Sequence, residues 1–281
     1  MSSKRWPGYL LAVTLSMLTS AVAQAAIMSV DLNSWTVESY PPVSGFGGAS
    51  WNVAADGSSV LQTVNGQPTV FYSDFNVLNS DVRGRLSVQT SADDDYVGFV
   101  LGFNPGDTAS AVADFLLVDW KQITQSYNFS GGTADLTPGS TAAAGLAVSR
   151  VSGVPTADEL WGHTSFGETG DAGGLTELAR GATLGQTGWQ DFVEYSFRFV
   201  FRQDSLQVFV DDLLQLSVSG SFSDGRLGFY NFSQNQVSYS AFTFEDVPPE
   251  PPTEPVPEPG TLVLLGLGIA GIGLVRRRKI A

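Results

Sequence analysis

Apolar residues occur in short runs of strand length along most of the chain, and turn residues separate these runs. The clearest run covers residues 192–202, where Tyr195, Phe197, Phe199 and Phe201 alternate with other residues. Alternation with a period of two places these four aromatic side chains on one face of a β-strand. The pattern therefore predicts a strand whose aromatic face is buried.

Two other runs, 96–103 and 115–120, are apolar almost throughout and rich in Val, Phe and Leu. Continuous apolar runs of this length, broken by Asn104-Pro105-Gly106, are typical of buried strands joined by a surface loop. Further short runs predict the remaining strands: 60–64, 69–75, 85–90, 146–151, 206–210, 213–218, 225–232 and 237–244.

Turn signals suggest how some of these strands connect. Asn65-Gly66 predicts a hairpin between 60–64 and 69–75, and Asp211-Asp212 predicts another between 206–210 and 213–218. The segment 35–57 is predicted to form an irregular edge, and 131–145 a loop. Residues 158–188 carry few strand signals. Many short strands without a long amphipathic helix indicate an all-β fold, an antiparallel β-sandwich of the jelly-roll kind.

The amino-acid composition excludes several kinds of catalytic and metal site. The chain has 281 residues, no cysteine and a single histidine, His163. It therefore has no disulfide framework, no cysteine nucleophile and no zinc site built from Cys and His. No Gly-x-Ser-x-Gly motif accompanies His163, which favours a structural role. No Glu-x-Asp-x-x-Glu strand supplies the paired carboxylates of a glycosidase. The sequence thus predicts a protein that is not an enzyme.

The charge is unevenly distributed. Of 14 basic residues six lie at the two ends of the chain, which leaves eight against 28 acidic residues in the whole sequence. Phosphate binding needs a basic patch, so nucleic acid is excluded as a partner.

Three consecutive carboxylates, Asp93, Asp94 and Asp95, directly precede the apolar run 96–103. Neighbouring carboxylates repel one another unless solvent or a cation relieves them. Calcium is a hard cation that prefers oxygen ligands, so this cluster is the candidate metal site. A solvated acidic turn is the alternative interpretation.

Both ends of the chain carry transport signals. Residues 1–25 have the charged start, apolar middle and small-x-small ending of a secretory signal peptide. Residues 247–260 form a proline-rich spacer. The tail, 261–281, begins with an apolar stretch of 15 residues without charge, 261–275. The apolar stretch predicts a short transmembrane helix, and the basic residues that follow it are expected to stay cytoplasmic.

Several spaced motifs resemble the C-terminal domain of thrombospondins: DDDYVGFVLGF with VDWKQITQSY, QTVNGQPTVFYSDFN, Leu160-Trp161-Gly162-His163-Thr164, Gly188-Trp189 and GRLGFYNFSQNQVSYSAF. The resemblance runs from about residue 35 to 245. It implies a lectin-like, concanavalin A-like β-sandwich over 31–246 and calcium at Asp93, Asp94 and Asp95. The aspartate repeats and cysteines of that family are absent. Asp119 replaces an apolar residue in its receptor-binding stretch, so receptor recognition is not expected.

The tail resembles the PEP-CTERM sorting signal through Pro257-Glu258-Pro259, the apolar stretch, and the basic end with Arg276, Arg277, Arg278 and Lys279. This resemblance implies an exosortase-type membrane protease as partner and an association with exopolysaccharide or biofilm matrix.

The chain is therefore expected to cross the inner membrane, to be held transiently by its tail, and to reach the cell surface or extracellular matrix. The predicted function is a calcium-binding adhesion or structural protein. A carbohydrate-binding lectin is the first alternative and a glycoside hydrolase the second.

Overall fold

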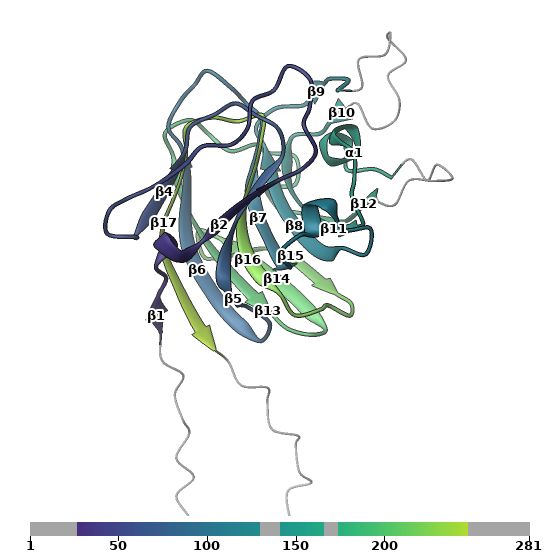
Figure 1. Cartoon of the computed structure of the whole chain (residues 1–281). Coiled ribbons are helices and arrows are strands. Elements are labelled where there is room, and N and C mark those ends of the chain that lie inside the picture. Colours follow the sequence, from purple (N-terminus) through teal and green to yellow (C-terminus); the bar gives the residue numbers. More distant parts are fainter. Residues whose placement is uncertain (1–26, 130–140, 166–173, 247–281) are drawn as a thin grey trace, which may run out of the picture.

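Two antiparallel β-sheets packed face to face form the body of the computed structural model, which describes residues 27–129, 141–165 and 174–246 (Figure 1). Sheet A contains, in spatial order, β15 (Leu213–Ser219), β14 (Ser205–Val210), β13 (Glu194–Phe201), β6 (Ser80–Val88), β17 (Val237–Asp246), β4 (Ser59–Gln62) and β3 (Trp51–Val53), and β1 (Met28–Ser29) also pairs with β17. Sheet B contains β12 (Gly174–Arg180), β11 (Gly145–Ser152), β8 (Asp114–Lys121), β7 (Tyr96–Phe103), β16 (Arg226–Phe232), β5 (Thr69–Asn76) and β2 (Thr36–Ser39). The predicted all-β antiparallel sandwich is confirmed.

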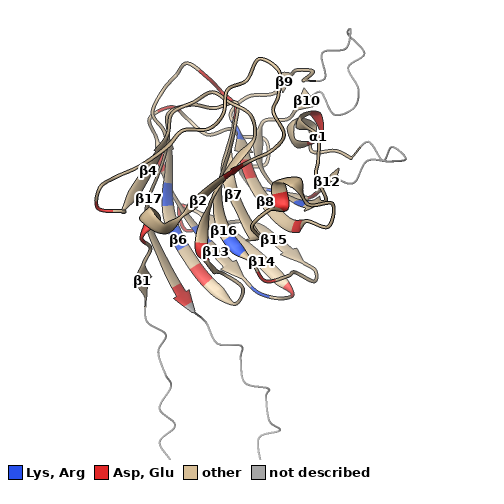
Figure 2. Cartoon of the chain, viewed as in Figure 1, with Lys and Arg blue, Asp and Glu red and all other residues tan. Residues whose placement is uncertain are grey.

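The remaining elements are short. A two-stranded ribbon joins β9 (Gln125–Ser126) to β10 (Thr141–Ala142), and the helices are η1 (Leu32–Ser34), η2 (Asp107–Ala109) and α1 (Ala157–Gly162). Figure 2 shows acidic positions on many strands and loops and few basic ones. Among the described residues, no helix is long and apolar enough to span a membrane. The predicted tail helix, 261–275, lies outside the described residues, as do the signal peptide and most of the loop 131–145.

Aromatic side chains fill the space between the sheets. The predicted face of β13 points inward: Phe197, Phe199 and Phe201 are buried, and Tyr195 packs against the same core. From sheet B, Phe99 meets Phe199 with ring centroids 4.8 Å apart. Burial of these large rings provides the main driving force for packing one sheet on the other.

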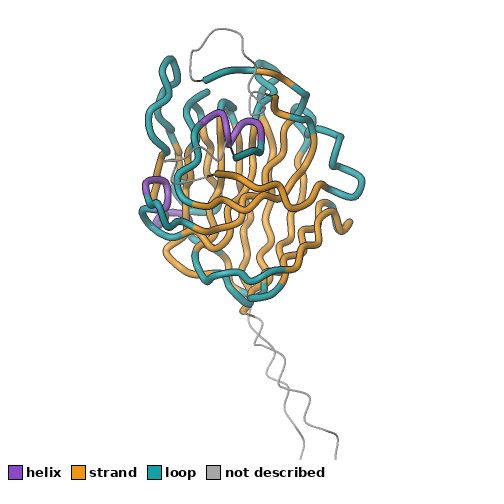
Figure 3. Tube along the Cα trace, turned by 90° about the vertical axis from the view of Figure 1, so that its right-hand side faces the viewer, coloured by secondary structure: helices purple, strands orange, loops and turns teal. Residues whose placement is uncertain are grey.

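Sheet B is buried on its other face as well, which explains the continuous apolar runs of β7 and β8. A second cluster that includes Tyr96, Phe103, Trp161 and Phe232 covers this outer face. α1 and nearby loops lie over the sheet, and Figure 3 shows the helix in front of the strands. A capping box between Thr156 and Glu159 starts α1. The segment 158–188, which showed few strand signals, thus contains part of a helix and the edge strand β12.

The two predicted hairpins had opposite outcomes. Asp211-Asp212 joins β14 to β15 with φ angles of 49° and 64°, as a type I′ turn requires. The Asn65-Gly66 hairpin is wrong, because β4 lies in sheet A and β5 in sheet B. Gly66 instead bridges Gly47 in parallel, and a Cβ there would lie 2.5 Å from the Gly47 carbonyl oxygen. The glycine serves a close backbone approach rather than a tight turn.

The strand register places Asp93–Asp95 far from the described chain ends. Asp246 pairs with Ser80, at the start of β6, and β5 ends just before that point. β16 begins beside the end of β5 and finishes beside Tyr96, the first residue of β7. β1 pairs with the last part of β17. The acidic cluster therefore lies at one end of the sandwich, and both described chain ends lie at the other (Figure 1).

We predict that Phe99→Ala lowers the free energy of unfolding by about 3–5 kcal/mol, because the ring is fully buried between the sheets. Phe192→Ala is the matched control: Phe192 is 64% exposed, and its loss should change stability by less than about 0.5 kcal/mol. Urea unfolding of both variants measures the difference. Equal midpoints would contradict the assignment of the core.

Candidate functional site

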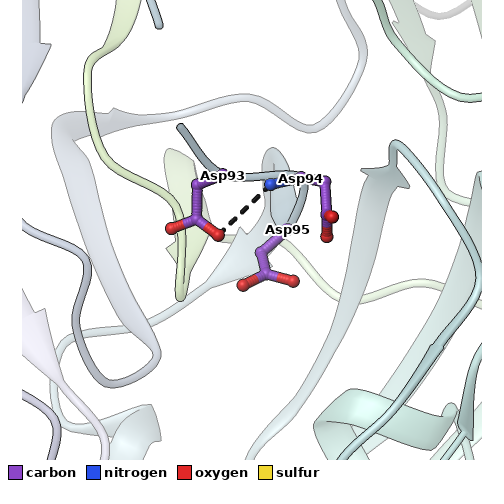
Figure 4. A group of neighbouring side chains, drawn as sticks. All are labelled: Asp93, Asp94 and Asp95. Atoms are coloured by element: carbon purple, nitrogen blue, oxygen red, sulfur yellow. Dashed lines mark hydrogen bonds between the residues drawn. The ribbon is translucent and has the colours of Figure 1, made fainter. Parts of the chain in front are cut away.

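The three aspartates of the predicted metal site form one cluster at the start of β7. One carboxylate oxygen from each of the three lies within 4.8 Å of those of the other two. In Figure 4 the three side chains extend to the same side of the backbone, and the Asp95 carboxylate lies between those of Asp93 and Asp94. The three aspartates lie in the irregular segment directly before β7. Three like charges this close need neighbours that compensate them.

Lys121, the last residue of β8, supplies one positive charge from inside the protein. Its Nζ donates to Asp94 Oδ1 at 2.8 Å and to Asp95 Oδ1 at 2.7 Å. The same nitrogen donates to the Asp94 carbonyl oxygen at 2.8 Å and to Gln125 Oε1 at 3.0 Å. It also lies 5.0 Å from the centre of the Trp161 ring. The Lys121 side chain is fully buried, so this ion pair is part of the fold.

Asp93 takes no part in the contacts of Lys121. Its carboxylate accepts from Asn65 Nδ2 and from the backbone N–H of Asp94. Partial burial, followed by the negative charge of Asp95, raises the pKa of Asp93 to about 7. Burial also raises the pKa of Asp95, and Lys121 offsets only part of that effect. The three carboxylates therefore outnumber the one cation, Lys121, that contacts them.

Residues from distant parts of the chain hold the backbone of the cluster. The N–H of Asp95 donates to Gln234 Oε1 at 2.8 Å, and Trp189 Nε1 donates to the Asp95 carbonyl oxygen at 3.1 Å. Gln234 follows β16 and Trp189 precedes β13, so loops from both sheets meet here. Such support fixes the positions of the carboxylates before any ligand arrives.

The donor set fits a hard divalent cation beside Asp93 and Asp95. Carboxylate oxygens are ligands that calcium prefers. Asn65 faces Asp93 with its Nδ2, and its Oδ1 accepts from Ser233 Oγ at 3.2 Å. Asp95 Oδ1, Asp94 Oδ1 and the Asp94 carbonyl oxygen already accept from Lys121, so Asp93 is the aspartate of the cluster that makes no contact with this cation. The structure thus brings all three predicted residues together but gives them different partners.

A second buried network lies on the same face of sheet B. His163 Nε2 lies 3.0 Å from Asp119 Oδ2, and His163 Nδ1 lies 3.0 Å from Glu177 Oε2. Arg180 pairs with Glu177 at 2.7 Å. Burial lowers the pKa of His163, but Asp119 and Glu177 outweigh it and raise the pKa to about 9. A charged imidazole between two carboxylates explains how Asp119 is accommodated in an otherwise apolar strand.

Of the residues that contact the aspartate cluster, only Lys121 could have been suspected from the sequence. Lys121 is the only lysine between Lys4 and Lys279, and it directly follows an apolar run. A charged residue in that position signals a buried ion pair, because lysine is rarely buried without one. Asn65, Trp189 and Gln234 carry no such signal, since only the fold brings them to the cluster.

An antiparallel sandwich with an acidic, lysine-supported loop at one end defines the class of this protein. The family described as Thrombospondin C-terminal region matches residues 47–246, and the chain belongs to that family. A PEP-CTERM protein-sorting motif matches residues 255–279. Both resemblances seen in the sequence are confirmed.

The relatives are much longer proteins. Thrombospondin-1 of Xenopus laevis is 29% identical over 208 residues, which cover 70% of this chain and 16% of that protein. Thrombospondin-4 of Bos taurus is 32% identical over 205 residues, or 68% of this chain and 19% of that protein. The chain therefore matches less than a fifth of the length of these relatives.

Solved structures show weaker likeness. The carbohydrate binding module CBM66 from Bacillus subtilis has a TM-score of 0.45 at 10% identity, covering 73% of this chain and 99% of the module. The exoplasmic/lumenal domain of VIP36, in a Ca2+/Man3GlcNAc-bound form, has a TM-score of 0.44 at 10% identity, covering 79% and 87%. We infer no ligand from these likenesses.

We predict that Lys121→Met destabilises the domain by about 3–5 kcal/mol at neutral pH, because it leaves Asp94 and Asp95 without their buried cation. Arg85→Met is the control, since the Arg85–Glu194 pair is half exposed and contributes little. Chemical unfolding of both variants measures the cost. A loss below 1 kcal/mol for Lys121→Met would contradict the structural role of this ion pair.

Proposed function

We propose that the protein is an exported, calcium-binding adhesion or structural protein of the cell surface or extracellular matrix, associated with exopolysaccharide or biofilm matrix. One observation carries the proposal. The acidic cluster lies at the end of the sandwich opposite Asp246, after which the chain leads to its sorting motif. A domain held by its C-terminal tail would present this end outward.

Calcium is proposed to bind between Asp93 and Asp95, with Asp94 held by Lys121 as its inner support. The support is the charge of the cluster: three carboxylates face one buried ammonium group. A bound Ca2+ would neutralise the remaining charge and join the loops that meet there. Asp93 would then release its proton more readily, because a nearby cation favours the carboxylate.

The sorting motif supports the proposed route. The chain would be exported by a signal peptide, 1–25, and its sandwich domain, 31–246, would be carried by the spacer 247–260. The tail, 261–281, would anchor it in the inner membrane until an exosortase-type protease recognises Pro257-Glu258-Pro259 and the basic end. The protein would then reach the surface or matrix.

The proposed role is not enzymatic. His163, the single histidine, has a side chain only 4% exposed, and both ring nitrogens face carboxylates. It offers no free position for a substrate.

Carbohydrate binding is the second candidate function. An open hollow on sheet A favours it, because arginine, serine and phenylalanine side chains line this hollow. A glycoside hydrolase remains the third candidate.

We predict that millimolar calcium raises the melting temperature of the calcium-free protein by several degrees. Binding to the folded state alone adds about 2.7 kcal/mol at a ligand concentration 100 times the dissociation constant. Each kcal/mol shifts the melting temperature by about 2–4 °C in a domain of this size. Asp93→Asn should remove most of the gain, and Asp74→Asn, at an exposed position of β5, should keep it.

The calcium effect should also depend on pH. The pKa of Asp93 is raised to about 7, so protons compete with the ion below that value. The gain in melting temperature should be larger at pH 8 than at pH 5.5, and binding near pH 7 should release protons. Thermal melts and calorimetry in two buffers measure both effects. An unchanged melt of the parent, or a full response of Asp93→Asn, would contradict calcium binding at this cluster.

We predict that replacing Arg276, Arg277, Arg278 and Lys279 by Gln weakens retention in the inner membrane and delivery to the surface, because cytoplasmic basic residues set the orientation of a short membrane helix. Exchanging the three arginines for lysine is the control that keeps the charge. Fractionation of cells measures both. Equal surface delivery of the Gln variant and the parent would contradict a sorting role for the basic end.

A further inference from the structure

Three of the eight basic residues between positions 27 and 246 gather on the outer face of sheet A. Arg83 and Arg85 come from β6, and Arg198 comes from the neighbouring β13 (Figure 2 colours such residues blue). Arg198 lies directly opposite Arg83 in the antiparallel pair. Like charges in this position destabilise a sheet unless an anion lies between them. An arrangement of this kind in so acidic a chain calls for a physical reason.

The arginines surround a hollow of about 260 Å³. Short side chains form part of its lining: Ser196 lies opposite Arg85, and Ala241 lies in a bulge of β17. Ala241 has a φ of 54°, which is strained for a residue other than glycine. Bulges of this kind re-aim side chains and often lie beside binding sites. The bulge places Ala241 in the lining of the hollow.

Three carboxylates, Asp81, Glu194 and Asp212, lie beside the arginines, but they do not use all of the guanidinium donors. Asp81 accepts from Arg83 Nε at 3.2 Å and from Arg198 Nε at 2.8 Å and Nη2 at 2.5 Å, so one carboxylate serves two guanidinium groups. Arg85 pairs with Glu194 at 2.9 Å, but both side chains are half exposed and such a pair is weak. Within the described part of the chain, Arg83 hydrogen-bonds through Nε alone, and its side chain is 55% exposed. Guanidinium donors thus remain available on the open side.

We infer that this hollow binds the carboxylate of an acidic sugar, a uronate unit of a polysaccharide. Guanidinium groups match the planar geometry of a carboxylate and bind it through paired hydrogen bonds. Phe209 lines the same hollow, with its ring 5.1 Å from the Arg198 guanidinium, and offers an apolar surface to a sugar ring. Ser196 and Asp212 offer polar partners for sugar hydroxyls.

We choose an acidic sugar as the ligand because charged, polar and aromatic side chains all line the hollow. A simple anion would use the arginines but neither Phe209 nor Asp212, and a neutral sugar would leave the arginines unpaired. The net charge of the chain is −14, so an acidic polymer is repelled by most of the surface. In this hollow the exposed guanidinium donors of Arg83 and Arg85 can bind its carboxylate. The inference rests on the adhesive function proposed above and names the chemical class of its ligand.

Calorimetric titration of the full-length chain in non-ionic detergent with oligogalacturonate tests the inference. We expect saturable binding that weakens with salt, and no binding of the methyl-esterified oligomer, which lacks the carboxylate charge. Arg83→Gln and Arg85→Gln should each weaken binding about tenfold or more, the loss typical of a hydrogen bond to a charged group. Arg150→Gln, an arginine paired with Asp114 on sheet B, is the control and should bind like the parent.

Phe209→Leu should weaken binding of the oligomer while leaving its salt dependence unchanged, because it removes the aromatic surface and keeps the arginines. Equal affinity of the parent and Arg83→Gln, or equal binding of the esterified oligomer, would overturn the inference. So would preferred binding of a peptide with the acidic sequence 247–259. Calcium melts of the same arginine variants should match the parent, so failure here is distinguishable from failure of the calcium proposal.

Discussion

The ammonium group of Lys121 is the interaction on which the end of the sandwich depends. It is fully buried and meets four oxygen atoms, from Asp94, Asp95 and Gln125. Removing one partner of a buried ion pair costs more than the pair itself contributes, because an uncompensated charge remains. The pair therefore ties the end of β8 to the start of β7. The loops that carry Trp189 and Gln234 then attach to Asp95.

Because of this ion pair, the three aspartates have different partners. Asp94 and Asp95 share the internal cation, while Asp93 is left with neutral donors and a pKa raised to about 7 by burial and by Asp95. A site that retains negative charge after its internal pairing can accept a cation without breaking the fold. The folded loop is thus arranged in advance, which lowers the ordering cost of binding. Asp95 would take part in both fold stability and ion binding, whereas Asp94 serves the Lys121 pair and Asp93 is left for the ion.

The parts that could be predicted from sequence were those fixed by local pattern. The aromatic face of β13 and the bounds of β7 follow from periodicity and apolar run length, since both strands are long and regular. Asp211-Asp212 formed its turn because both flanking strands stay in one sheet. Asn65-Gly66 failed because a turn signal does not tell which sheet receives the next strand. The same crossover brings Asn65 to Asp93, a contact without any local cause.

The contacts of the candidate site were even less predictable from local sequence patterns than the strands and turns. Three consecutive aspartates marked the position of the site in the sequence. The positive charge that partly neutralises them comes from Lys121, 26 residues beyond Asp95. The arginine hollow has no motif at all, because Arg83 and Arg198 are 115 positions apart in the sequence and meet only through the register of β6 and β13. At both sites, like charges lie close together, and such places are candidates for ligand binding. At the end of sheet B the protein supplies part of the counter-charge itself, and on the open face of sheet A one buried carboxylate serves two arginines. In both places a charged side chain keeps access to solvent: Asp93 at the end of sheet B and Arg83 on the open face of sheet A.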